Sequence, residues 1–440
     1  MDGYYAWMIV ATALVLMMTT PALALFYGGM SRSKSVLNMM MMSYVSLGIV
    51  GIVYVLWGWS MAFAGDDVGS LFGNPFDAWA LKDVPWESYI GGVMFQMTFA
   101  AITVALISGA IADRVKLSAW VLFVPVWVTV CYFPISHQVW STGVGFVSKH
   151  FGAQDYAGGT VVHINAGVAG LVLALVIGKR VGFGKEPMRP HNLTLTMIGA
   201  GLLWFGWYGF NVGSMVFLEG DGGEKDIAQF MSETGVTFLN TTIATCAAML
   251  GWLAMERILH GKATSLGAAS GIVAGLVAIT PSCGAVDITG AIVIGAAAGV
   301  LCAWAVGLKF KVGMDDSLDV VGVHLVGGLV GTLLIGLFST ADAPGGIDGL
   351  FYGGGFGSLG DQAAAAGWAI LWTGVLTTVI AFAIKFTLGW RVTEEAEVEG
   401  IDSDQHGESA YDLHSGLGGG TTAPSTSVLA KHTVTEGVNA

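Results

Sequence analysis

Two nine-residue stretches decide how this chain folds: Asp155–His163, which reads DYAGGTVVH, and Asp316–His324, which reads DSLDVVGVH. In each stretch an aspartate stands eight residues before a histidine, and the histidine lies inside an otherwise apolar segment. Glycines follow both histidines at the same offsets, at positions 167 and 170 and at positions 328 and 331. A titratable side chain is expensive to place within a bilayer and is a functional candidate by default. The repetition indicates a duplicated architecture with one polar feature from each half.

The composition of the chain is typical of a polytopic membrane protein. Of its 440 residues, 54% are hydrophobic and only 11% are charged, whereas a soluble globular protein carries about 25% charged residues. Glycine is abundant, at 65 residues, and small residues let helix backbones approach closely inside a bilayer. The net charge of −13 argues against a nucleic-acid-binding protein, which would present a basic face.

The cysteines do not indicate a disulfide framework or a metal site. They lie within or beside apolar segments and form no CxxC pair: Cys131, Cys246, Cys283 and Cys302. We interpret them as small buried hydrophobic side chains.

A requirement of about 20 apolar residues per helical span predicts an all-α protein with eleven transmembrane helices. The predicted spans cover about 5–29, 37–64, 89–111, 117–136, 158–178, 194–218, 228–258, 265–281, 284–308, 318–339 and 363–390. The amino terminus lacks a basic n-region and a small-residue cleavage site, so the first segment is interpreted as a span and not as a removed signal peptide. Residues 1–391 are thus the predicted membrane domain. Residues 392–440 are a polar tail with a possible helix start at Thr393 and predicted disorder beyond about 415.

The placement of Lys and Arg residues fixes the predicted orientation. One set of alternate connections holds twelve of them: Arg32, Lys34, Arg114, Lys116, Lys179, Arg180, Lys185, Arg189, Arg257, Lys262, Lys309 and Lys311. The other set holds three: Lys82, Lys149 and Lys225. Basic residues favour the cytoplasmic side, so the amino terminus is predicted outside and the tail in the cytoplasm.

The span count also predicts how the two halves are related. The repeat halves cover about residues 5–180 and 190–340 and contain five spans each. An odd repeat unit enters the membrane in the opposite sense the second time, so the halves are predicted to be inverted repeats, as in many transporters. The eleventh span lies outside the repeat and is expected to pack around its perimeter.

The two histidines are the strongest functional candidates. His163 is expected just over a turn into a span entered from outside, and His324 about two turns into one entered from inside. They could be structural, but their match across a repeat favours a transport pathway. A neutral imidazole offers one hydrogen-bond donor and one acceptor and can pass on a proton. A metal site is the weaker alternative, because no third histidine, cysteine or intramembrane carboxylate is expected beside them.

The aspartates and aromatic residues allow more than one interpretation. Asp155 suits a helix N-cap and could also contribute negative potential; Asp316 and Asp319 carry the same ambiguity. Phe95 and Phe99 share one helical face, and Trp140 is expected in an outer loop. Further aromatic residues crowd the sixth span before Asn211 and Ser214: Trp204, Trp207, Tyr208 and Phe210. Such residues usually serve packing or an interfacial belt, but ring faces can also build a site for a small cation.

The stretch from Asp155 to Gly167 resembles the signature of the ammonium transporter (Amt) family, which is related to the Rh proteins. The resemblance continues through GKRVGFGK at 178–185, GWYGFN at 206–211, TPSCG at 280–284 and HGESAY at 406–411. It covers essentially residues 5–414. The chain keeps histidine at both twin positions, whereas some relatives replace the first with glutamate.

The resemblance implies an outer substrate site. At matching positions, Trp140, Phe99 and Ser214 would recruit ammonium, with the aromatic faces stabilising the cation and the hydroxyl accepting a hydrogen bond. Asp155 would support that site electrostatically and not by direct contact. Thr280 would belong to the surroundings of the pore on the periplasmic side.

The resemblance also implies a gated pore. Phe99 and Phe210 would stack as a gate, His163 and His324 would form the twin-histidine pair below it, and Trp207 would line the path. A homotrimer with one pore per subunit is implied, in the cell membrane, with a PII-type signalling protein as partner on the cytoplasmic face. No cofactor, metal, nucleic acid or enzymatic activity is implied.

Physical cost indicates how ammonium, and also methylammonium, would cross. Moving a bare cation into an apolar pore costs on the order of tens of kcal/mol in the idealised limit, so a narrow pore should favour ammonia. We expect recruited ammonium to lose a proton near the gate, while the histidines relay that proton and make transport electrogenic. Inward charge movement would gain about 2.3 kcal/mol per 100 mV. A passive ammonia channel, a sensor signalling through the tail and PII, and a membrane metal enzyme are the alternatives.

Overall fold

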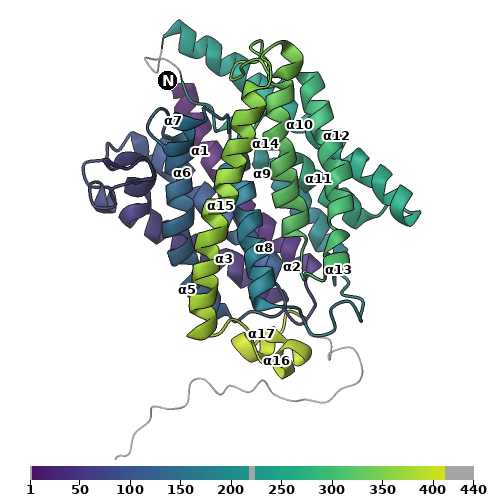
Figure 1. The fold of residues 1–440 in the computed structure, drawn as a ribbon. Helices are drawn as coiled ribbons and strands as arrows, with labels where there is room; N and C mark the ends of the chain where they lie inside the picture. The colour runs from purple at the N-terminus through teal and green to yellow at the C-terminus, as the bar shows by residue number, and fades with distance from the viewer. Residues whose placement is uncertain (1, 218–222, 412–440) are drawn as a thin grey trace, which may run out of the picture.

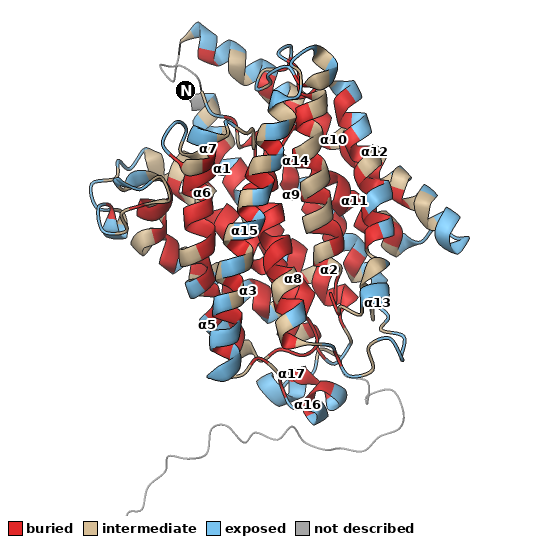
Figure 2. Ribbon diagram, in the orientation of Figure 1, coloured by how far each residue is buried: buried red, intermediate tan, exposed pale blue. Residues whose placement is uncertain are grey.

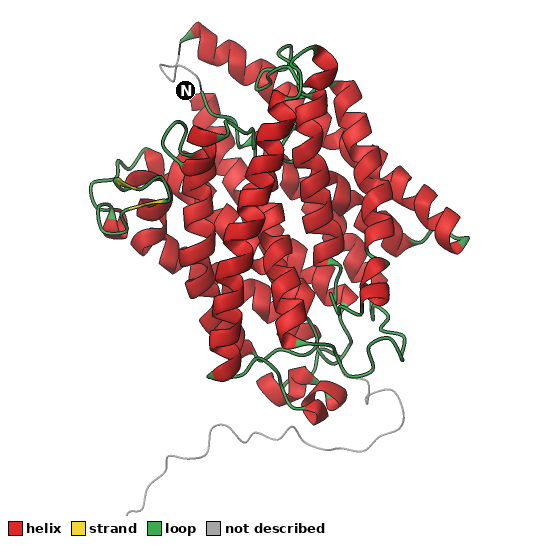
Figure 3. Cartoon of the chain, in the orientation of Figure 1, coloured by secondary structure: helices red, strands yellow, loops and turns green. Residues whose placement is uncertain are grey.

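The apolar segments form long helices that run side by side in the computed structural model, which describes residues 2–217 and 223–411. Figure 3 shows these helices joined by loops. Within the described residues the single sheet is an antiparallel hairpin of β1 (Asp67–Val68) and β2 (Phe72–Gly73). The predicted all-helical membrane fold is therefore confirmed. The disorder expected beyond residue 415 lies outside the described residues.

The α-helices follow one another along the chain without further sheet structure in the described ranges. Their bounds are α1 (Asp2–Met17), α2 (Ala24–Met30), α3 (Val36–Val53), α4 (Phe95–Ile107), α5 (Leu117–Trp127), α6 (Phe133–Trp140), α7 (Phe146–His150), α8 (Asn165–Ile177), α9 (Leu193–Val212), α10 (Glu224–His260), α11 (Ser265–Ile279), α12 (Ile288–Ala305), α13 (Leu308–Val312), α14 (Val326–Phe338), α15 (Gly357–Phe386), α16 (Glu394–Glu399) and α17 (Ile401–His406). Short 3-10 or π-helical turns adjoin several of these helices. Ten continuous helical segments of the described chain are long and apolar enough to cross a membrane.

Helix α11 differs from its predicted span. The sequence predicted a span over about 265–281, but the helix has 15 residues and ends at Ile279. At a rise of 1.5 Å per residue it covers only about 22 Å. Pro281 follows after Thr280, and a proline has no backbone N–H to continue a helical ladder. A run of turns over residues 280–284 takes its place.

Trp140 lies on a helix and not in the loop that the sequence predicted. The segment that begins at Leu117 continues through α5 and α6 as far as Trp140, four residues beyond the predicted end at 136. The polar side chains just before Trp140 are buried: His137 bonds to Asp67 and the Ala62 carbonyl, and Gln138 bonds to the Leu71 carbonyl. Their partners come from the β1–β2 hairpin and the helix before it, which only the folded chain brings close.

The two ends of the described chain lie at opposite ends of the bundle. In Figure 1 the amino terminus is at the top, whereas α16 and α17 are at the bottom. Thr393 caps α16 by accepting a hydrogen bond from the Ala396 N–H, which confirms the helix start predicted there. The carboxylate of Asp402 in α17 accepts hydrogen bonds from the N–H groups of Leu37 and Asn38, at distances of 3.0 and 2.8 Å.

The core of the bundle surrounds α4 and α8. Every residue of α4 except Gln96 is buried, and Figure 2 shows burial concentrated on the inward faces of the helices. Helix α15 packs along both α8 and α14. Its Thr373 hydroxyl donates a hydrogen bond of 2.8 Å to Asn165 at the start of α8. The eleventh predicted span therefore lies at the perimeter, as expected.

Candidate functional site

Each histidine of the paired stretches lies in a π-helical turn at the start of a longer helix. His163 belongs to η8 (Gly159–Ile164), which leads into α8, and His324 belongs to η9 (Val321–Leu325), which leads into α14. Single π-helical turns occur frequently at functional sites. The repeated spacing in the sequence therefore corresponds to a repeated local structure.

Asp155 caps the first of these turns with both carboxylate oxygens. One oxygen accepts hydrogen bonds from the N–H groups of Gly158 and Gly159, and the other from those of Thr160 and Val161, at 2.6 to 3.1 Å. The residue keeps some contact with solvent, but removal of its carboxylate from water raises its pKa. The four donors oppose that shift because they favour the ionised form. The helix-capping interpretation of Asp155 is confirmed.

Asp316 caps the second turn less completely. Its carboxylate accepts hydrogen bonds from the N–H groups of Val320 and Val321, at 3.0 and 2.8 Å. Burial raises the pKa of Asp316 to about 6, while Lys309 opposes the shift and Asp319 adds to it. Asp319 has a different role: it forms an ion pair with Lys309 and adopts a left-handed backbone with φ of 64°.

The left-handed residue changes the expected depth of His324. The predicted span began at 318, two turns before the histidine, but the helical turn begins at Val321. A non-glycine residue at positive φ does not continue a right-handed helix, so the helix cannot include Asp319. His324 is therefore three residues into its helix, similar to His163, which is four residues into η8.

Two glycines allow the histidine-bearing turns to touch. A Cβ on Gly167, four residues after His163, would lie 2.5 Å from the backbone nitrogen of Leu325, the neighbour of His324. A Cβ on Gly328, four residues after His324, would lie 3.1 Å from the Cβ of His163. The contacts are reciprocal, because each glycine accommodates the turn of the other half. This explains why a glycine stands four residues after each histidine in the sequence.

The close approach brings the two imidazoles together. The Nδ1 atoms of His163 and His324 are 3.4 Å apart, and the ring planes differ by 22°. If both rings are neutral, one Nδ1 must donate and the other accept, so the two tautomers differ. The Nε2 atom of His163 is buried and has no hydrogen-bond partner among the described residues. A polar edge is therefore left free for a small hydrogen-bonding molecule.

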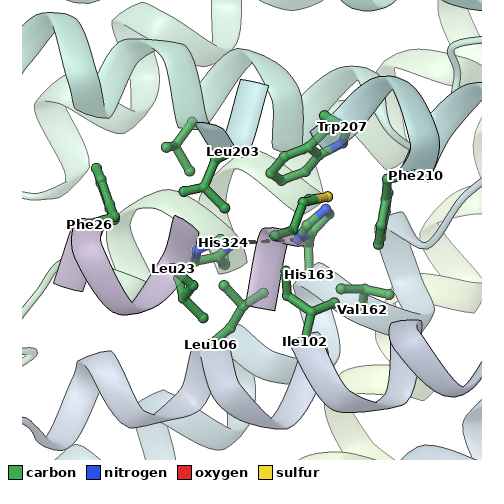
Figure 4. Close-up of a pocket in the computed structure, with 12 residues that line it drawn as sticks. Leu23, Phe26, Ile102, Leu106, Val162, His163, Leu203, Trp207, Phe210 and His324 are labelled. Carbon is green, nitrogen blue, oxygen red and sulfur yellow. Dashed lines mark hydrogen bonds between the residues drawn. The ribbon is translucent and has the colours of Figure 1, made fainter. Parts of the chain in front are cut away.

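The histidines line a narrow and otherwise apolar cavity. Figure 4 shows the pair surrounded by aliphatic side chains, with Trp207 and Phe210 on one side. The lining residues are Met18, Leu23, Phe26, Ile102, Leu106, Val162, His163, Leu203, Trp207, Phe210, Val273 and His324. The cavity volume is about 10 Å³, close to the least that holds a single water molecule. Such a space admits a neutral molecule of that size and offers little to solvate a cation.

A stacked pair of phenylalanines separates this cavity from the end of the bundle that carries the amino terminus. The rings of Phe99 and Phe210 lie 4.0 Å apart with an interplanar angle of 12°. Trp140 meets Phe99 edge to face at 5.9 Å, and its indole N–H donates to the Asp155 carbonyl. Trp207 stacks on His163 at 5.5 Å. The aromatic residues that the family resemblance implied for the site therefore form one contiguous column with the histidines: Trp140, Phe99, Phe210 and Trp207.

The remaining site candidates lie around that column. Trp207 donates a hydrogen bond of 2.8 Å to the Thr280 hydroxyl. The Ser214 hydroxyl donates to the Phe210 carbonyl at 2.8 Å, which leaves its oxygen able to accept. Ser214, Trp140 and Asp155 line an outer cavity of about 570 Å³. Ser148 of α7 also lines it, so the cavity opens at the end of the bundle that carries the amino terminus (Figure 1).

The sequence interpretation missed one buried carboxylate at this outer cavity. Glu233 in α10 is buried, lines the cavity and accepts a hydrogen bond of 2.7 Å from the Tyr156 hydroxyl. It lies inside the segment predicted as a span over 228–258, at the outer cavity and not beside the two histidines. The rule that singled out the histidines would have found it. In the described part of the chain, no three histidine, cysteine or acidic residues are placed to hold a metal ion.

The opposite end of the bundle gathers the basic connections. The buried guanidinium of Arg180 pairs with Asp113 at 3.0 Å and with Asp315 at 2.8 Å. Arg391 pairs with Glu397 of α16, whose carboxylate also accepts from the Val181 N–H. These contacts fix the last described helices to connections that the sequence assigned to the cytoplasmic side.

Comparisons with known proteins agree on one family. The pattern of the Ammonium Transporter Family matches residues 6–411. An ammonium transporter of Mycobacterium tuberculosis is 53% identical, covering 93% of this chain and 90% of the relative. An ammonium transporter of Aquifex aeolicus is 46% identical, covering 93% of this chain and 94% of that relative.

Solved structures give the same result for the fold. The crystal structure of Saccharomyces cerevisiae Mep2 is 30% identical, covers 89% of this chain and 87% of that one, and has a TM-score of 0.77. A structure described as a sensor Amt protein is 27% identical, covers 92% of this chain and 98% of that one, and has a TM-score of 0.81. Together with the long apolar helices, these matches identify a multi-pass protein of the cell membrane. The chain belongs to the ammonium transporter family.

Proposed function

We propose that this protein carries ammonium across the membrane by separating it into ammonia and a proton and conducting both. The observation that carries the proposal is the His163–His324 pair, with Nδ1 atoms 3.4 Å apart, in a narrow apolar cavity behind stacked phenylalanines. The relatives described as ammonium transporters support the substrate. Methylammonium, which also carries N–H donors, is the expected analogue.

Recruitment takes place in the outer cavity. Trp140 lines this cavity and offers a ring face, which attracts a cation, and Ser214 offers a hydroxyl oxygen. Phe99, which is not among the lining residues, meets Trp140 at 5.9 Å and completes the proposed site. Asp155 contributes negative potential only, because its carboxylate is already engaged by four backbone N–H groups. The ammonium ion loses most of its hydration here, so the site must replace water contacts with these groups.

Conduction follows loss of one proton near the Phe99–Phe210 gate. The N–H bond of ammonium breaks, ammonia retains the electron pair, and ammonia passes through the apolar cavity without the cost of burying a charge. The proton moves along the imidazoles: one nitrogen accepts it while another releases one, and the shared Nδ1 contact connects the rings. Ammonia and a proton recombine on the other side, so one positive charge crosses for each ammonium ion.

The same proposal includes the topology predicted from the sequence. Eleven spans, counting the shorter α11, place the amino terminus outside and the tail in the cytoplasm; the opposite positions of the described chain ends support this (Figure 1). The reciprocal contacts of Gly167 and Gly328 support two inverted five-helix repeats, over about 5–180 and 190–340. Residues 1–391 are the membrane domain and residues 392–440 are the tail. A homotrimer and a PII-type partner at the cytoplasmic face are proposed on the family resemblance.

A sensor is the second candidate function. The structural neighbour described as a sensor Amt protein favours it, and the hydrogen bonds of Asp402 to α3 provide a contact between the tail and the membrane domain. A pure sensor would bind ammonium without accumulating it. Uptake of labelled methylammonium into a transporter-deficient cell separates the two functions, because a pure sensor accumulates none.

Current measurement tests the central proposal. We expect the purified protein, reconstituted into bilayers, to give a current with an ammonium gradient and none with an equal potassium gradient, because potassium has no proton to lose. A passive ammonia channel would change the internal pH without current. Absence of ammonium-evoked current would therefore refute the electrogenic mechanism.

A further inference from the structure

Two carboxylates line the outer cavity, and they differ in how many hydrogen bonds they can still accept. Asp155 already accepts four backbone N–H donors. An ionised carboxylate has about four lone-pair positions, so Asp155 has none left for a ligand. Glu233 accepts two hydrogen bonds, one on each oxygen. Of these two carboxylates, only that of Glu233 can still accept a hydrogen bond from a ligand.

The position of Glu233 is held by neighbours that donate neutral hydrogen bonds. The Tyr156 hydroxyl donates to Oε1 at 2.7 Å, and the Gln229 side-chain amide donates to Oε2 at 2.8 Å. Glu233 is only 3% exposed, and it forms no ion pair with any described residue. A buried carboxylate is costly unless a positive charge compensates it.

The cavity itself offers no such positive charge. Among the described residues that line it there is no lysine, arginine or histidine. The lining includes a further acceptor, Gln96, whose side-chain carbonyl oxygen is buried and has no described hydrogen-bond partner. Gln96 precedes Phe99 by three residues in α4, so both belong to one face of the helix. The cavity therefore presents several oxygen acceptors and a negative charge, and no basic side chain among its described lining residues.

We propose that Glu233 is a substrate-binding residue, whose carboxylate and the Gln96 carbonyl hold a small N–H-donating cation in the outer cavity before it reaches the aromatic site. This inference rests on the proposed function and adds an anionic binding element to it. A tetrahedral ammonium ion has four N–H donors, which suits a site with several oxygen acceptors and an aromatic wall. Glu233 raises the local concentration of the cation, and the aromatic column passes it on.

The test compares variants of the full-length protein reconstituted into bilayers, with ammonium chloride as the probe. Glu233→Gln keeps the shape and removes the charge, and we expect the ammonium concentration for half-maximal current to rise on the order of tenfold, which corresponds to about 1.4 kcal/mol. Glu233→Asp keeps the charge and should remain within about threefold of the wild type. Maximal current should change little, because the gate and the histidines are intact.

Tyr156→Phe is the matched control, since it removes the hydrogen bond to Glu233 and leaves the charge. We expect it to shift the half-maximal concentration less than about twofold. An equal shift in Tyr156→Phe and Glu233→Gln would assign Glu233 a structural role and overturn the inference, as would an unchanged Glu233→Gln variant. If Glu233→Gln does not fold, Gln96→Leu provides the second test, with a rise of about threefold expected and an unchanged value contradicting the inference. A wild-type protein without ammonium current would instead refute the proposed function.

Discussion

The two aspartate–histidine turns have the same spacing and nearly the same backbone, but their surroundings differ. The turn of His163 is capped by four hydrogen bonds to Asp155, which itself lines the outer cavity. The turn of His324 is capped by two hydrogen bonds to Asp316 and lies beside the Lys309–Asp319 ion pair. The spacing thus encodes a capped π-helical turn, whereas neighbouring segments decide what each aspartate does besides capping.

The difference shows that one local solution can stand in two different surroundings. At the outer end the cap is saturated, so a separate carboxylate, Glu233, is available for a ligand. At the other end the cap is close to a lysine and a second aspartate, where its own ionisation remains sensitive to the environment. The histidines, by contrast, share one contact, because the Nδ1 atom of each lies 3.4 Å from that of the other.

The largest expected effect comes from removing the histidine that each of the two turns carries. In the combined His163→Ala and His324→Ala variant the proton relay is absent, and we expect the ammonium-evoked current to fall at least about a hundredfold, while expression remains normal. The current is measured in reconstituted bilayers, with selectivity against potassium as a second observable. His150→Ala, on the exposed surface of α7, is the control. Wild-type current and selectivity in the double variant would exclude a pore role for the pair.

A smaller expected effect is a difference in thermal stability between variants of the two capping aspartates, Asp155 and Asp316. Asp155→Ala leaves four N–H groups without an acceptor and Asp316→Ala leaves two, and each unsatisfied buried group costs about 1–3 kcal/mol. We therefore expect Asp155→Ala to lower the midpoint of thermal unfolding in detergent about twice as much. Asp155→Asn keeps one acceptor oxygen and should lie between Asp155→Ala and the wild type. Equal losses for the two alanine variants would show that the carboxylates do not act mainly as caps.

The smallest effect is a pH dependence that Asp316 contributes at the turn of His324. An aspartate has a pKa of about 3.9 in an unfolded chain, whereas burial raises that of Asp316 to about 6. Between these values the native state binds more protons than the unfolded state, so the contribution of this group to stability falls as the pH rises.

The variant Asp316→Asn cannot ionise and should lack that dependence. Relative to the variant, the wild type should lose up to about 3 kcal/mol of stability between about pH 4 and pH 7. Thermal midpoints of both proteins across this range measure the difference. A constant difference between them would mean that the pKa of Asp316 is not raised in the folded protein.

Much of the fold could be predicted because it depends on local sequence. The apolar runs are long enough to identify spans, and the tail helix at Thr393 follows from a capping residue next to acidic residues. The errors occurred where partners distant in the sequence decide local structure. Trp140 lies on a helix because His137 and Gln138 find buried partners in another segment. Glu233 was overlooked because its span was assessed by its apolar content alone.

The sequence by itself determined the number and order of the apolar segments, the side preferred by the basic residues, and the position of a capped histidine in each half. These properties depend on transfer of side chains from water and on hydrogen bonds between residues close in the chain. Only the tertiary structure decided that the histidines meet, that the phenylalanines stack above them, and that Glu233 retains acceptor capacity beside a saturated Asp155. Those features depend on close approach of helices far apart in sequence, which the contacts at Gly167 and Gly328 allow.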